Sequence, residues 1–228
     1  MAVGIAVVEP DPAGMYAAKA DAYFAGARAD FVDRLPRNPR AAILEIGCGS
    51  GETGALALGD GRAGRYVGIE LYPAAAARAS AVLSEVLVGD VQHMALEFAP
   101  GTFDALILSE VLEHLIEPQA VLARLAPALK PGAVVLASSP NIAHWRVVRE
   151  LLSGRFDLAD KGVFDRTHMR WFTPRTFARM FAASGYDVVR VGPVTPFSAR
   201  TRALSRLSGG RLDHLFTVQI CLEARRRA

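Results

Sequence analysis

The chain has 228 residues, of which 51% are hydrophobic and 21% are charged. This composition excludes a disordered or highly charged protein and predicts one folded α/β domain with a substantial core. The net charge of +3 comes partly from the C-terminal arginines at 225–227, which lack the interleaved aromatic residues of a nucleic-acid-binding tail. The two cysteines, Cys48 and Cys221, lie too far apart to suggest a disulfide framework, so we expect a reducing, cytoplasmic location.

The N-terminal region has two features. Its first apolar stretch lacks a basic leader and reaches Pro10 and Pro12 before it could span a membrane, so we expect neither a signal peptide nor membrane insertion. Residues 14–35 then place apolar side chains at roughly helical spacing. We therefore predict an N-terminal helical layer over 1–36, ahead of a main domain over 37–228.

From residue 41 onward, short apolar runs alternate with helix-like segments, as in a parallel sheet with crossover helices. Strands are predicted at 41–46, 65–71, 85–89, 103–109 and 132–138, and helices at 73–84, at 118–129 and after Thr173, a candidate N-cap. Two late runs, at 186–192 and 214–224, would complete the sheet as a hairpin-like pair at its far edge. The pattern predicts a Rossmann-like, doubly wound fold with a mostly parallel seven-stranded sheet and helices on both faces.

The stretch 141–172 fits neither the helical nor the strand period. It is rich in His, Arg, Asp, Trp and Phe. Irregular segments of this kind beside strand ends commonly provide lids and substrate contacts. We expect this stretch to form the lid and acceptor region.

The segment LEIGCGSG at 44–51 is a predicted strand followed by a glycine-rich turn. Missing side chains at Gly47 and Gly49 would let backbone amides approach a ligand, and dinucleotide enzymes use a similar turn. An acid at the end of the next strand, Glu70, suits either kind of cofactor. Glu45 separates the two interpretations, because an acid inside the first strand suggests a cationic or hydroxyl-bearing ligand.

At these positions the sequence resembles the class I S-adenosylmethionine (SAM)-dependent methyltransferases, whose motif E/D-x-G-x-G-x-G is matched by Glu45, Gly47, Gly49 and Gly51. The resemblance covers roughly 41–187. It implies that Glu45 and the glycine loop contact the methionine end of SAM, that Glu70 binds the ribose hydroxyls, and that Leu71 and Asp90 contact the adenine. Arg28 would close over the cofactor together with Tyr16 and Tyr23. The full predicted cofactor set is Glu45, Gly47, Cys48, Gly49, Gly51, Glu70, Leu71, Asp90, Val91 and Ser109.

The segment SEVLEHL at 109–115 predicts the acceptor side of the site. If it continues as a helix, Glu110, Glu113 and His114 share one face. With His168 they offer two carboxylates and two imidazoles, which could hold a divalent metal. The alternative is that Glu113 and His114 only shape the loop beneath the cofactor.

The same order of residues resembles the 3′-terminal 2′-O-methyltransferases of small RNA, and a similar E-x-x-E-H occurs in the catechol O-methyltransferases of ubiquinone biosynthesis. The resemblance implies Mg²⁺ that chelates two neighbouring hydroxyl groups. Two imidazoles are unusual for Mg²⁺, so Mn²⁺, Co²⁺ or Zn²⁺ remain alternatives. Without a metal, His168 or His144 would act as the general base, with Asp165 orienting it and Asn141 binding substrate.

The region 140–173 resembles the MetW-like and UbiG-like methyltransferases, including domains beside glycosyltransferases in polysaccharide biosynthesis. This resemblance implies a small hydroxylated or catechol-like substrate, with sugars favoured. We therefore predict a SAM-dependent O-methyltransferase. The alternatives are an RNA 3′-end methyltransferase, which the modest basicity disfavours, a SAM-binding regulatory partner of a biosynthetic enzyme, and a nicotinamide-dependent enzyme.

Overall fold

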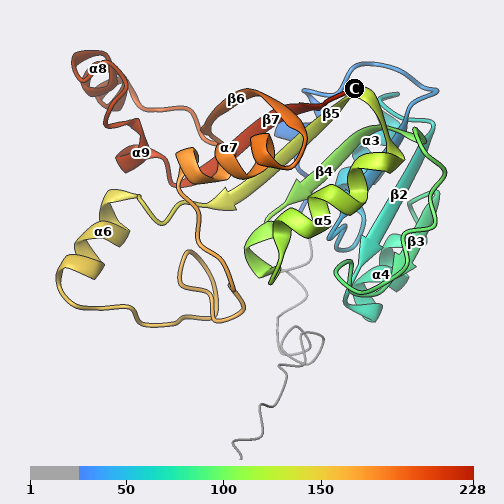
Figure 1. Cartoon of the computed structure of the whole chain (residues 1–228), viewed down its shortest axis with the longest axis horizontal. Coiled ribbons are helices and arrows are strands. Elements are labelled where there is room, and N and C mark those ends of the chain that lie inside the picture. Colours follow the sequence, from blue (N-terminus) through green and yellow to red (C-terminus); the bar gives the residue numbers. More distant parts are fainter. Residues whose placement is uncertain (1–25) are drawn as a thin grey trace, which may run out of the picture.

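The sheet has seven strands, in the order β3-β2-β1-β4-β5-β7-β6. The computed structural model describes residues 26–228, and Figure 1 shows helices on both faces of this sheet. Strands β1 to β5 are parallel, and β7 is antiparallel to both of its neighbours. The strands are β1 (Ala42–Ile46), β2 (Arg65–Glu70), β3 (Glu85–Val88), β4 (Phe103–Ser109), β5 (Leu129–Pro140), β6 (Tyr186–Pro193) and β7 (Gln219–Arg226). The predicted Rossmann-like, mostly parallel sheet is therefore confirmed.

The central strands are mostly apolar because both of their faces are buried, and Glu45 in β1 and Asp104 in β4 are acidic exceptions. Leu44 and Leu106 belong to one core with α5 (Pro118–Leu125) and α7 (Pro174–Ala183). Their neighbours Ile43 and Ile107 belong to a second core with α2 (Ala29–Val32), α3 (Glu52–Gly59) and α4 (Pro73–Ala79). Successive residues of a strand point to opposite faces, so consecutive apolar residues, such as 105–108 of β4, contribute to both cores.

The predicted helices have the expected starts but shorter lengths. Helix α4 ends at Ala79 rather than near 84, and α5 ends at Leu125, where the 3₁₀ turn η3 (Ala126–Ala128) continues the chain. Thr173 caps α7 as predicted, because its hydroxyl accepts from the Thr176 backbone N–H and the two residues form a capping box.

The prediction of the last strand is wrong at its beginning. Strand β7 starts at Gln219, so residues 214–218 are not part of it. The Asn141 side-chain nitrogen donates to the carbonyl groups of His214 and Thr217, at 2.7 and 2.6 Å. This long-range contact holds the chain in a corner where the apolar pattern alone predicts a strand.

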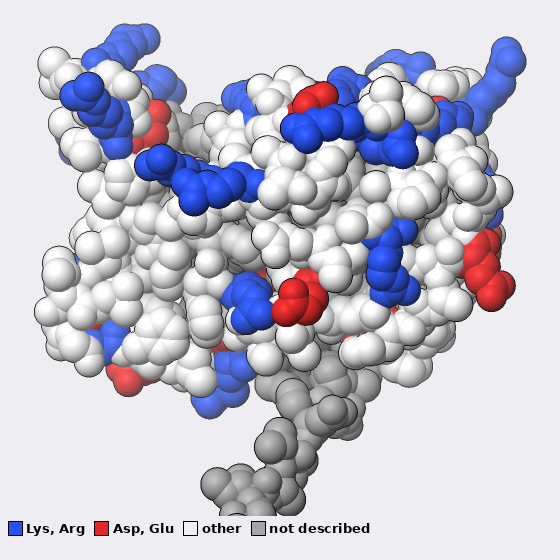
Figure 2. Space-filling model, viewed as in Figure 1, with Lys and Arg blue, Asp and Glu red and all other residues white. Residues whose placement is uncertain are grey.

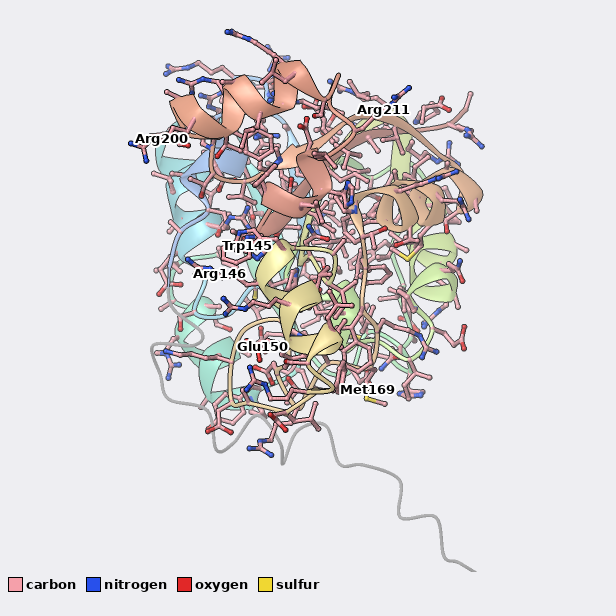
Figure 3. The ribbon with its side chains drawn as sticks, turned by 90° about the vertical axis from the view of Figure 1, so that its left-hand side faces the viewer. Trp145, Arg146, Glu150, Met169, Arg200 and Arg211 are labelled. Carbon is pink, nitrogen blue, oxygen red and sulfur yellow. The ribbon has the colours of Figure 1, made fainter. Side chains whose placement is uncertain are left out.

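Two helices that the sequence did not predict, α8 (Ala199–Leu207) and α9 (Asp213–Phe216), connect β6 to β7. The two strands do form an antiparallel pair at the far edge, but a long connection joins them. The region 141–172 likewise contains an unpredicted helix, α6 (Trp145–Leu152). Figure 3 shows α6 and α8 on the same side of the molecule, with Trp145 and Arg146 on α6 and Arg200 on α8.

The N-terminal helical layer falls mostly outside the described residues, as do Tyr16 and Tyr23. Within 26–36 the chain forms α2, whose Phe31 and Val32 are fully buried. Cys48 and Cys221 are buried free thiols. No helix within 26–228 combines the length and the apolar character needed to cross a bilayer.

Candidate active site

A cavity of about 450 Å³ lies where the carboxyl ends of the parallel strands meet. Glu45 near the end of β1, Glu70 at the end of β2, Asp90 after β3 and Ser109 at the end of β4 all line it. Four residues that are distant in the sequence thus share one wall, because parallel strands end at the same edge of a sheet. This cavity is the candidate active site.

The glycine loop forms the part of this wall that follows β1. Gly47 and Gly49 line the cavity with φ angles of +70° and +55°. A Cβ at Gly47 would lie 2.5 Å from a methyl carbon of Val111, so no side chain fits there. Gly51 does not line the cavity, and a Cβ there would lie 3.1 Å from the Ala79 Cα. Gly51 therefore allows close packing against α4. The structure does not place it on the cavity wall with the other predicted cofactor residues.

Glu70 joins the glycine loop to the turn after β2. Its carboxylate accepts from the backbone N–H of Gly49 at 2.8 Å and of Tyr72 at 2.9 Å. Burial raises the pKa of Glu70, and these backbone hydrogen bonds oppose that rise because they stabilise the charged form. The carboxylate is thus held in place by local backbone groups, beside Leu71, which also lines the cavity.

Glu45 has a different environment. It is 2% exposed, and the Tyr66 hydroxyl donates to it at 2.9 Å. Burial raises the pKa of Glu45 to about 8, so the carboxyl group retains its proton at neutral pH in the ligand-free protein. Cys48 also lines the cavity, and its sulfur packs against Gly68, where a Cβ would lie 2.4 Å from it.

Asp90 is fixed by the turn that follows β3. Its Oδ1 accepts from the Gln92 backbone N–H at 2.8 Å, and its Oδ2 lies 2.9 Å from Nδ1 of His93. Val91 and Gln92 line the same part of the cavity. The Gln92 side chain accepts from the Ile116 backbone N–H at 2.7 Å, which ties this turn to the segment after β4.

Arg28 approaches the cavity from the N-terminal side. It donates to the hydroxyls of Ser109 and Ser138, at 2.5 and 2.7 Å, and so bridges the ends of β4 and β5. Its remaining nitrogens donate to both carboxylate oxygens of Asp30, at 2.8 and 2.9 Å. The predicted contact of Arg28 with the cofactor region therefore has a geometric basis in its position along the cavity wall.

The cavity lining is acidic. Two side chains with a permanent positive charge, Arg28 and Lys161, line it together with seven carboxyl groups, those of Glu45, Glu52, Glu70, Asp90, Glu110, Glu113 and Asp165. On the face drawn in Figure 2, basic side chains gather along the end of the molecule where α8 and the C-terminus lie. The interior of the site favours a neutral or cationic ligand.

Three candidate metal ligands come together on the acceptor side. Glu113 and His114 lie in the 3₁₀ turn η2 (Leu112–His114), and His168 lies on the loop before α7. One side-chain donor atom from each lies within 4.8 Å of the others. Glu110 is not in this group, because it precedes the turn and has a φ of +53°. The predicted helical face of Glu110, Glu113 and His114 is therefore wrong.

Backbone carbonyl groups orient the two imidazoles. His114 Nδ1 lies 3.1 Å from the Thr167 carbonyl oxygen, and His168 Nδ1 lies 3.1 Å from the Val163 carbonyl oxygen. A neutral imidazole that donates from Nδ1 carries its lone pair on Nε2. The loop is also tied to η2, because the backbone N–H groups of 169 and 170 donate to the Glu113 carbonyl oxygen at 2.8 and 2.9 Å.

Glu113 is the carboxyl group of the site with the least hydrogen bonding. It is 1% exposed, neither carboxylate oxygen makes a hydrogen bond of normal geometry within 26–228, and the neighbouring Ser139 side chain opposes the rise of its pKa only in part. Burial and the neighbouring Glu110 carboxyl group raise the pKa of Glu113 well above its usual range. A buried carboxyl group without partners is costly unless a ligand completes it.

The other predicted acceptor residues differ in their placement. Asp165 lines the cavity, and its Oδ1 accepts from the backbone N–H and hydroxyl of Thr167, at 2.9 and 2.7 Å. Asn141 is fully buried and anchors the corner before β7. His144 directly precedes α6, beside Trp145, and its side chain makes no capping hydrogen bond. It does not line the cavity, so the structure does not bring it together with the other candidates. Burial lowers the pKa of His144.

Several residues that line the cavity were missed by the sequence analysis. Gln92 follows Asp90 by two positions, so its proximity to the third strand end was a usable signal. Gln219 and Lys161 gave no such signal, because they lie far along the chain and reach the cavity only through the antiparallel strand β7 and the loop after α6.

Comparisons with known proteins agree with this geometry. A family model described as a methyltransferase domain matches residues 16–191. The ubiquinone biosynthesis O-methyltransferase of Xanthomonas campestris pv. campestris is 35% identical over 121 residues, which cover 50% of this chain and 49% of that protein. The chain therefore matches about half the length of this relative.

Two solved structures share the fold. One is a chain of the complex between the Haloferax volcanii Trm112 methyltransferase activator and a methyltransferase, with a TM-score of 0.67, 16% identity, and coverage of 97% of this chain and 100% of that one. The other is phosphoethanolamine N-methyltransferase 2 of Haemonchus contortus in complex with SAM, with a TM-score of 0.63, 18% identity, and coverage of 88% and 52%.

Proposed function

This chain belongs to the methyltransferase domain family of the class I SAM-dependent methyltransferases, and we propose that it methylates a hydroxyl oxygen of a small acceptor. The acceptor would carry neighbouring hydroxyl groups, as sugars and catechols do. One observation carries the proposal: a single cavity joins the acid-flanked glycine loop to Glu113, His114 and His168. Oxygen as the acceptor atom is supported by the O-methyltransferase relative that shares half of the chain.

The charge of the cavity suits SAM as the donor. SAM carries positive charge on its sulfonium and amino groups, and when bound it supplies an activated methyl group for direct transfer. The ionised carboxyl groups of the lining, among which Glu45 does not count at neutral pH in the ligand-free protein, would attract such a ligand and repel the pyrophosphate of a nicotinamide dinucleotide. Glu70 would accept from the ribose hydroxyls, Asp90 from the adenine amino group, and Glu45 with the glycine loop would hold the methionine end.

The Glu113, His114 and His168 cluster suits a divalent metal. The unpartnered carboxylate of Glu113 and the two imidazoles, each oriented through Nδ1, form a mixed oxygen and nitrogen donor set. Such a set favours Mn²⁺, Co²⁺ or Zn²⁺ over the harder Mg²⁺. The ion would supply Lewis-acid assistance that makes the acceptor hydroxyl easier to deprotonate.

His168 offers a metal-free route to the same result. Its Nε2 could take the proton of the acceptor hydroxyl, while the Val163 carbonyl oxygen at Nδ1 would stabilise the resulting imidazolium. The loop of residues 163–170, which is hydrogen-bonded to η2, would close the acceptor side against water.

The proposal is tested by incubating the protein with SAM and panels of sugars, sugar derivatives and catechols, and by searching for products heavier by one CH₂ unit. Activity that EDTA abolishes and Mn²⁺ or Zn²⁺ restores would support the metal, whereas full activity in EDTA would leave His168 as the base. SAM binding without product from any acceptor would instead support the regulatory alternative.

A further inference from the structure

Glu110 has an unusual backbone conformation at the end of β4. Its φ of +53° makes it the one non-glycine residue within 26–228 that has a positive φ. Such a conformation costs roughly 1 kcal/mol for a residue with a side chain, and it persists where neighbouring structure imposes it. The Glu110 backbone N–H donates to the Ser138 carbonyl oxygen at 3.3 Å, which ties the strained turn to β5. The turn places Glu110 on the cavity wall.

The Glu110 carboxyl group has hydrogen bonding at only part of its capacity. Burial raises its pKa, while hydrogen bonding from Gln219 and Ser138 opposes the rise. Its Oε1 is buried and has no hydrogen-bond partner within 26–228. Because Glu110 also lines the cavity, a ligand there that brings an O–H or N–H donor would add to the hydrogen bonding of this carboxyl group.

Gln219 is held beside Glu110 by the corner before β7. Its backbone pairs with Pro140 at the end of β5, and its carbonyl oxygen accepts from the Val194 backbone N–H at 3.0 Å. Asn141 fixes the preceding residues through the carbonyl oxygens of 217 and 218. When the Gln219 amide nitrogen donates to Glu110, its amide oxygen remains as a second acceptor.

We propose that Glu110 and Gln219 form a subsite that binds a hydroxyl or amine group of the methyl-accepting molecule. This group donates a hydrogen bond and is separate from the oxygen that is methylated. The subsite takes a hydroxyl or a protonated amine and rejects a carboxylate or phosphate, because both of its available groups are acceptors. The inference rests on the proposed function, and it narrows the acceptor to neutral or cationic polyhydroxylated molecules.

This role differs from metal binding. Glu113, His114 and His168 form the compact donor group, and Glu110 lies outside it. Glu110 also lies after β4, whereas the acids assigned to the ribose and adenine follow β2 and β3. The subsite therefore belongs to the acceptor and not to the metal or to SAM.

The test uses binding, so it does not require turnover. Protein loaded with S-adenosylhomocysteine is titrated calorimetrically with three catechol probes: catechol itself, dopamine with its protonated amine, and 3,4-dihydroxybenzoate with its carboxylate. Wild type should bind dopamine at least about tenfold more tightly than the benzoate. Glu110→Gln and, independently, Gln219→Ala should reduce that preference to about twofold or less. The control is Glu117→Gln, which removes the same charge at an exposed position outside the cavity. This variant should keep the preference for dopamine.

Two further titrations separate the alternatives. SAM affinity and Mn²⁺ affinity should each stay within about twofold of wild type in Glu110→Gln, whereas Glu113→Gln should weaken Mn²⁺ binding by at least about tenfold. A comparable loss of Mn²⁺ in Glu110→Gln would make Glu110 a metal ligand, and a loss of SAM would make it a cofactor residue. Either result overturns the subsite, as does equal affinity for the three probes or no binding of any. An absence of methylated product with the probe preference intact would instead refute the O-methylation proposal alone.

Discussion

The cavity has a donor end, lined by Glu45, Glu70 and Asp90, and an acceptor end, lined by Glu110, Glu113, His114 and His168. The carboxyl groups at the two ends have different hydrogen-bond environments. At the donor end, backbone N–H groups from adjacent turns donate hydrogen bonds to the carboxylates of Glu70 and Asp90. At the acceptor end, both carboxylate oxygens of the buried Glu113 and one oxygen of the half-buried Glu110 lack a hydrogen-bond partner within 26–228, although Asp165 accepts from Thr167. The donor end is thus organised before any ligand arrives, whereas the acceptor end is completed by what binds there.

This difference has an energetic reason. Backbone N–H groups that donate to a carboxylate stabilise its charged form and fix its position in the free protein. Unpartnered buried carboxyl groups store unfavourable free energy that a ligand can release. Variants at the two ends should therefore separate SAM affinity from acceptor chemistry.

The largest effect is expected for SAM binding by Glu70→Ala. The change removes the carboxylate that we propose accepts from two ribose hydroxyls, and it also releases the Gly49 N–H of the glycine loop. Because hydrogen bonds to a charged group contribute about 1.5–3 kcal/mol each, SAM affinity should fall about 100-fold or more in calorimetric titration. The control is Glu85→Ala, which should bind SAM normally. Glu85 lies on β3 and forms an exposed ion pair with Arg65 of β2. Normal SAM binding by Glu70→Ala would contradict the donor-end assignment.

His168→Ala should have the opposite profile. Turnover on the identified acceptor should fall about 100-fold, because either the base or a metal ligand is lost, while SAM affinity stays within about twofold of wild type. His214→Ala, at an exposed position outside the cavity, serves as the control. Unchanged turnover in His168→Ala would remove this residue from the acceptor chemistry.

A smaller loss of SAM affinity is expected for Asp90→Asn. The amide oxygen can still accept from the Gln92 N–H, but the charge that would attract the adenine amino group is gone. Calorimetric titration should show a loss of about fivefold to tenfold. A loss as large as that of Glu70→Ala would mean that Asp90 organises the turn and does not merely contact the adenine.

A separate prediction concerns stability and not binding, and it is a pH dependence that arises from Glu45. Its pKa of about 8 in the folded protein lies above the ordinary value of 4.5, so between these values the unfolded chain is ionised while the folded protein retains the proton. Rising pH therefore favours unfolding in this range. Urea unfolding without ligand should show that Glu45→Gln is more stable than wild type at pH 8, by an amount on the order of a few kcal/mol that shrinks toward about pH 5. Parallel pH profiles of the two proteins would show that Glu45 is ionised throughout.

Sequence reasoning succeeded where the structural cause is local or periodic. The strand ends that carry Glu45, Glu70 and Asp90 follow from apolar runs of the right length, and parallel strands bring their ends to one edge. The capping pair of Thr173 and Thr176 is likewise a local signal. Such features depend on neighbours within a few residues.

It failed where a distant contact decided the conformation. Residues 214–218 have a strand-like pattern, yet the Asn141 side chain holds them in a corner. Glu110 follows a strand in a segment that suggested a helix, yet its N–H bonds to β5 and its φ is positive. His144 looked equivalent to His168 in the sequence, and the structure brings only His168 to the cavity.

By itself, the sequence determined the sheet, the glycine loop and the three acids of the donor end, because strand periodicity and a short turn specify them. The tertiary structure alone decided which acids and imidazoles meet at the acceptor end. These residues come from η2, from the loop before α7 and from the start of β7, and their meeting depends on hydrogen bonds between segments about 50 to 100 residues apart. No local pattern encodes such contacts, because each segment is compatible with another conformation until the whole sheet has formed.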